Sequence, residues 1–133
     1  MAKRFGRRIL LGHLSHNVAD PALAAPLTAM IADTYRYEGS MYGLFSTLQN
    51  FALSNRAALY RGVGERNLPT LLMWGSSDHV TPITGLDTAR TLLHPNQIQV
   101  LACGHMAPWE RPAEVADRLT AFINFHSERN TNS

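Results

Sequence analysis

Cysteine is scarce in this chain: Cys103 is the only one among 133 residues. A lone thiol cannot form an internal disulfide framework, and it cannot build a thiolate-rich metal site. Long apolar runs are also missing, because no stretch approaches the roughly 20 residues that a membrane-spanning helix needs. We therefore expect no membrane insertion, and we expect Cys103 to be a small buried hydrophobe.

Charge is low as well. Charged residues make up 17% of the chain and the formal net charge is +2, while 45% of the residues are hydrophobic, as in a soluble globular protein. The basic excess gathers near Lys3 and Arg8 instead of forming a broad basic surface, which argues against a nucleic-acid partner. These charges precede Ile9-Leu10-Leu11, but polar residues soon interrupt the run, so we predict a cytoplasmic location over export.

No phosphate-binding loop and no metal pattern stand out. Gly62-Val-Gly64 is too short for a dinucleotide fingerprint and follows no predicted strand. Asp78, His79 and His105 match no zinc-ligand spacing. We therefore expect neither a cofactor nor a metal.

The chain divides at about residue 66. Apolar residues recur at three- and four-residue steps around 27–35 and 41–51, which predicts two amphipathic helices. The stretch between them contains Gly39, a helix breaker, and Ser40, which suits the cap of the second helix. Residues 1–66 are thus predicted to be a helical segment.

Residues 67–133 show the pattern of an α/β protein. Thr70–Trp74 and Ile98–Leu101 read as short strands, the first of them apolar on both faces. A helix is predicted between them, after Pro82, and a closing helix begins at Pro112. This β-α-β-α order predicts parallel strands whose carboxyl ends share one edge of the sheet, where open α/β sheets bind ligands.

Two ionisable residues follow these strands. Asp78 lies in Trp74-Gly-Ser-Ser-Asp78-His-Val-Thr-Pro82, and His105 lies in Cys103-Gly-His105-Met-Ala-Pro-Trp-Glu-Arg-Pro112. A carboxylate that accepts the imidazole Nδ1 proton makes the histidine an effective general base, so the two are candidate catalytic residues. The structural alternative is that Asp78 caps the helix after Pro82 and His105 fills a loop.

These motifs, in this order and followed by an amphipathic helix, resemble the C-terminal part of the α/β-hydrolase family. The resemblance implies that Asp78 is the acid and His105 the base of a catalytic triad, and that 1–66 is similar to the helical cap over the active site. Val80 and Met106, beside the acid and the histidine, would by the same resemblance face the substrate, with core packing as the alternative for each.

The resemblance also implies a nucleophile, usually serine in G-x-S-x-G, upstream of the acid. No upstream serine of this chain has that context: Ser15, Ser40, Ser46 and Ser54 all lack the flanking glycines. Cys103 follows the acid, contrary to the family order.

We therefore expect an incomplete α/β-hydrolase fold that lacks its central strands and its nucleophile: a truncated gene product, a piece prepared in isolation, or half of a split enzyme. Its expected activity is hydrolysis of an ester or similar small apolar substrate, with a complementary N-terminal segment or a second copy of the chain as a partner. The alternative is a non-catalytic remnant that acts at most as an interaction module.

Overall fold

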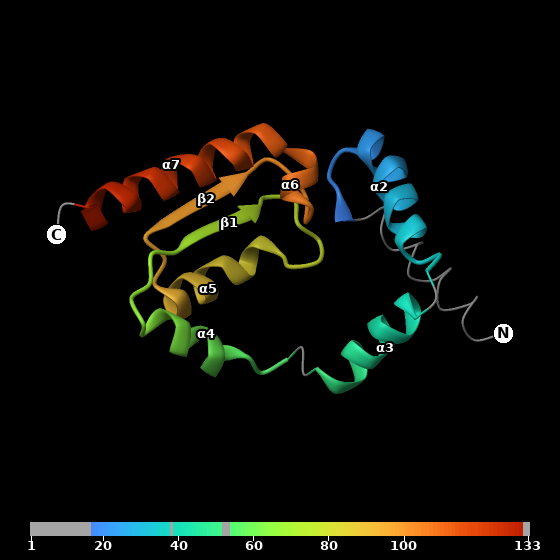
Figure 1. Ribbon diagram of the computed structural model, residues 1–133, viewed down its shortest axis with the longest axis horizontal. Coiled ribbons are helices and arrows are strands. Elements are labelled where there is room, and N and C mark those ends of the chain that lie inside the picture. Colours follow the sequence, from blue (N-terminus) through green and yellow to red (C-terminus); the bar gives the residue numbers. More distant parts are fainter. Residues whose placement is uncertain (1–16, 38, 52–53, 132–133) are drawn as a thin grey trace.

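The protein is described by a computed structural model that covers residues 17–37, 39–51 and 54–131. At its centre are two parallel strands, β1 (Leu71–Gly75) and β2 (Gln97–Leu101), with Leu71 opposite Gln97 and Gly75 opposite Leu101 (Figure 1). Both strands lie within one residue of their predicted positions. The predicted class is confirmed in the form of a partial α/β fold.

The sheet carries helices on both faces, which explains why the first strand is apolar on both sides. Met73 packs against the buried cluster of Leu101, Cys103 and Val115, on the face that α7 (Pro112–Thr131) covers. Its neighbours Leu72 and Trp74 point the other way and line an apolar groove with α5 (Leu86–Leu93). Alternate residues of β1 therefore serve two different helices.

The remaining C-terminal elements are short. A 3-10 turn, η2 (Ile83–Gly85), precedes α5, and α6 (Ala107–Glu110) precedes α7. Helix α4 (Ala57–Gly64), which the sequence did not single out, packs against α5. A Cβ atom on Gly64 would collide with the Leu92 carbonyl, so glycine permits this close approach. The predicted boundary at residue 66 stays a prediction.

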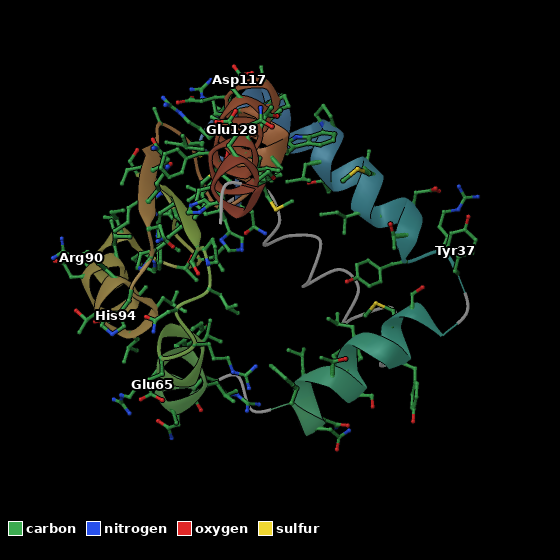
Figure 2. All side chains as sticks on the ribbon, turned by 60° about the vertical axis from the view of Figure 1, so that its left-hand side comes forward. Tyr37, Glu65, Arg90, His94, Asp117 and Glu128 are labelled. Carbon is green, nitrogen blue, oxygen red and sulfur yellow. The ribbon has the colours of Figure 1, made fainter. Side chains whose placement is uncertain are left out.

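Two further helices, α2 (Pro21–Thr34) and α3 (Ser40–Asn50), form the predicted pair joined by a turn. Figure 1 shows this pair on the side of the molecule away from α5, and Figure 2 shows it opposite Arg90 and His94. Gly39 sits in the turn with a left-handed φ of 88°, which favours glycine. The predicted capping role of Ser40 is wrong: its hydroxyl donates to the Thr34 carbonyl at 3.0 Å and closes the end of α2 instead.

The closing helix begins at Pro112, as predicted, but its side chains described after Val115 are exposed or half-buried. Val115 is 7% exposed, whereas Leu119 and Ile123, farther along the helix, are 41% and 58% exposed. None of the described helices has both the length and the apolar character to cross a bilayer.

Candidate active site

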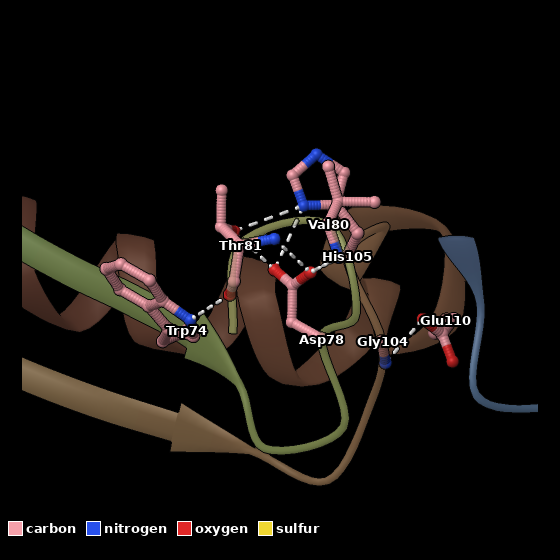
Figure 3. A network of polar contacts seen from close by, with 7 residues as sticks. All are labelled: Trp74, Asp78, Val80, Thr81, Gly104, His105 and Glu110. Carbon is pink, nitrogen blue, oxygen red and sulfur yellow. Dashed lines mark hydrogen bonds and ion pairs between the residues drawn. The ribbon is translucent and has the colours of Figure 1, made fainter. Parts of the chain in front are cut away.

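The loop after β1 is organised around Asp78, whose side chain is only 5% exposed. Oδ1 accepts hydrogen bonds from the backbone N–H groups of Val80 and Thr81, both at 2.8 Å. Oδ2 accepts from the Thr81 hydroxyl at 2.7 Å (Figure 3). The alternative that Asp78 caps the next helix is wrong, because neither η2 nor α5 has a side-chain cap.

His105, in the loop after β2, meets this carboxylate. Its Nδ1 lies 2.9 Å from Asp78 Oδ2 and 3.4 Å from Thr81 Oγ1. The contact expected between the two loops is thus present. The histidine side chain is 36% exposed, and Figure 3 shows its other ring nitrogen, Nε2, pointing away from Asp78.

The electrostatics of Asp78 favour its charged form. Burial acts to raise the pKa of this carboxyl, but hydrogen bonds from the Thr81 side chain, His105 and the Thr81 and Val80 amides outweigh burial and lower the pKa to about 2. A carboxylate that is ionised at neutral pH is an acceptor only, so Nδ1 of His105 must donate to it. In the neutral imidazole, Nε2 is then left with a free lone pair and can accept a proton.

Glycine is needed where the end of β1 approaches the histidine loop, and again where that loop approaches residues 17–20. A Cβ atom on Gly75 would collide with the carbonyl oxygens of Cys103 and Gly104. One on Gly104 would crowd the backbone of Asn17 and Ala19. Backbone hydrogen bonds continue the sheet between the loops, from Ser76 N to Leu101 O at 2.8 Å and from Ser77 N to Cys103 O at 3.0 Å.

Sequence reasoning missed two residues that organise the site. Thr81 bonds the Asp78 carboxylate, and its position three residues after an aspartate is a recognisable turn signal. Glu110, which is buried with 8% exposure, accepts from the Gly104 amide at 2.7 Å, beside His105. Its partners in the 17–20 segment are too distant in sequence for any local pattern to announce them.

Three other predicted residues have defined environments. Val80 is 51% exposed on the acid loop, and its contact with substrate stays a prediction. Met106 is half-buried at the start of α6. Cys103 is fully buried in the core, as expected, and burial followed by the nearby Glu110 charge raises the pKa of its thiol. Among the described residues, no group of three His, Cys, Asp or Glu side chains could hold a metal ion.

Comparison with known proteins yields partial relatives, although no protein-family model matches the chain. This chain is 30% identical over 79 residues to monoacylglycerol lipase ABHD6 of Bos taurus. It is also 30% identical over 70 residues to the protein of the same name from Mus musculus. The human protein of the same name is 29% identical over 70 residues. These matches cover 58%, 52% and 52% of this chain but only 23%, 21% and 21% of the respective relatives.

Proposed function

We propose, from the relation of this chain to the α/β-hydrolases and its likeness to the C-terminal portion of their fold, that it supplies the acid and the base of a nucleophile-Asp-His triad for ester hydrolysis. The observation that carries the proposal is the 2.9 Å contact between Asp78 Oδ2 and His105 Nδ1. The chain spans less than a quarter of the length of the relatives it matches. We propose that the rest of the catalytic apparatus lies on a complementary segment.

In the proposed reaction, His105 Nε2 takes the proton of a nucleophilic hydroxyl as its oxygen attacks the ester carbonyl carbon. Asp78 stabilises the imidazolium that forms, because its charge faces the Nδ1–H. The imidazolium then gives its Nε2 proton to the departing alcohol, which leaves an acyl-enzyme. Water, deprotonated by the same nitrogen, releases the acid and restores the nucleophile.

The nucleophile is proposed to come from outside this chain. Cys103 is unsuited, since it is buried and its pKa is raised, so the reactive thiolate is disfavoured. The name of the relatives, monoacylglycerol lipase, supports a carboxylic ester with an apolar acyl chain as the substrate class. The half-exposed Val80, beside Asp78, and Met106, beside His105, are proposed to contact that chain.

The test is hydrolysis of p-nitrophenyl butyrate by the isolated chain and by the longer product encoded with its upstream reading frame. We expect the longer product to turn over the ester and His105→Ala to abolish this turnover. We expect the isolated chain to match its own His105→Ala variant, after subtraction of free-imidazole catalysis. A longer product with no G-x-S-x-G and no turnover would contradict the proposal.

The second candidate function is that of an interaction module without catalysis. It is favoured by the exposure of large apolar side chains on α3 and α4, among them Tyr42 at 77% and Leu59 at 59%. The same assay separates the two, because an interaction module would not need His105.

A further inference from the structure

We infer that Glu110 is a positioning residue: its carboxylate clamps the histidine loop to the segment that leads into α2, and this clamp holds His105 at bonding distance from Asp78. The inference rests on the proposed function for its catalytic meaning. The clamp itself is a matter of geometry within the described chain.

The carboxylate of Glu110 bridges two segments that are far apart in sequence. Oε1 accepts from the Gly104 amide at 2.7 Å, one residue before His105. Oε2 accepts from the amide of Ala19 at 2.8 Å and from that of Asp20 at 3.4 Å. Asp20 is the N-cap of α2, so one side chain joins the histidine loop to the start of that helix.

The 17–20 segment reinforces the same junction. The Asn17 carbonyl accepts from the amides of His105 at 2.8 Å and Met106 at 3.2 Å. Three successive amides of the loop, those of residues 104 to 106, are therefore held by Glu110 and by a segment that Glu110 itself anchors. Shifting either one would move the backbone from which the imidazole projects.

Because Glu110 is buried, losing its hydrogen bonds would cost free energy. An ionised carboxylate that is 8% exposed is costly unless it is hydrogen-bonded. None of the ion pairs among the described residues involves Glu110, and its stabilising partners are backbone N–H groups on both oxygens. A glutamine in its place would turn its NH₂ group toward one of these N–H donors. The variant therefore keeps the hydrogen bond to one segment, either Gly104 or Ala19, and loses the hydrogen bond to the other.

The experiment is NMR spectroscopy of the full chain and its Glu110→Gln variant, with Glu114→Gln, a half-exposed glutamate of α7, as the matched control. The low-field Nδ1–H signal of His105 is identified by its loss in Asp78→Asn. We expect Glu110→Gln to weaken or abolish this signal and to raise the exchange rate of the Gly104 amide about tenfold, with the fold retained by circular dichroism. Glu114→Gln should change neither.

A wild-type measurement keeps the test independent of how the variant folds. If the clamp is one unit, the amides of Gly104 and Ala19 exchange at rates within a few-fold of each other. Exchange of the Ala19 amide that is tenfold faster than that of the Gly104 amide would overturn the inference. So would an unchanged His105 Nδ1–H signal in a folded Glu110→Gln variant. Neither readout requires ester hydrolysis, so failure here is distinguishable from failure of the proposed function.

Discussion

At the scale of single residues, the carboxylate of Asp78 has two roles, one for each oxygen. One oxygen binds two amides of its own loop, and the other faces the Thr81 hydroxyl and the His105 ring. The first role fixes the direction of the side chain, and the second gives the imidazole a negative partner. A structural turn and a candidate catalytic contact are thus the same group.

Thr81→Val tests how far the threonine hydroxyl supports this charge. The substitution keeps the side-chain shape and removes one charge-assisted hydrogen bond, so the pKa of Asp78 should rise by about one unit from its value of about 2. Carbon-13 NMR titration of the Asp78 carboxyl measures it. Thr84→Val, a threonine of η2 that no described hydrogen bond ties to Asp78, serves as the control. An unchanged titration would contradict this role of Thr81.

Asp78→Asn tests the link between this carboxyl and acid stability. The folded pKa of about 2 lies below the ordinary value of 3.8, so the unfolded chain binds more protons between these values. The resulting stability, about 2 kcal/mol, is fully present above pH 4 to 5 and is lost as pH falls toward 2.

Urea unfolding of both proteins at neutral pH and near pH 2.5 measures this difference. The gap in the free energy of unfolding between wild type and Asp78→Asn should shrink in acid. A gap that stays constant over this range would mean that the Asp78 charge does not stabilise the fold.

At the scale of elements, the site exists because two parallel strands end side by side. The sequence predicted this from alternating strand and helix signals, and it therefore also predicted that Asp78 and His105 would meet. Sequence patterns of this kind are local. They could not predict that 17–20 docks on the histidine loop, because those contacts join residues about 90 positions apart. They also assigned Ser40 the wrong role, because its hydroxyl bonds a carbonyl at the end of the preceding helix, α2.

Gly75→Ala tests the close approach of the two loops. A methyl group there would collide with the Cys103 and Gly104 carbonyls, so we expect a loss of about 1 to 3 kcal/mol in stability and loss of the His105 Nδ1–H signal. Gly43→Ala, in α3 with open space around it, should instead stabilise by about 0.5 to 1 kcal/mol. Equal effects from the two variants in urea unfolding would refute the argument from close packing.

At the scale of the whole molecule, the described chain leaves much apolar surface in contact with solvent. Within the described residues the sheet has only β1 and β2, and apolar grooves of about 310 and 340 Å³ lie beside α4. Two strands with open edges are a poor basis for independent stability. This surface is consistent with the proposal that a complementary segment completes both the sheet and the triad.

The most direct test of that central claim is a chimera in which residues 68–126 of this chain replace the matching region of the mouse monoacylglycerol lipase. We predict that the chimera hydrolyses p-nitrophenyl butyrate, and that Asp78→Asn and His105→Ala each lower kcat/KM by about a thousandfold or more. The exposed Asp87→Asn and His94→Asn should stay within about twofold of the parent chimera. A folded chimera that is inactive, or one whose activity survives His105→Ala, would contradict the account.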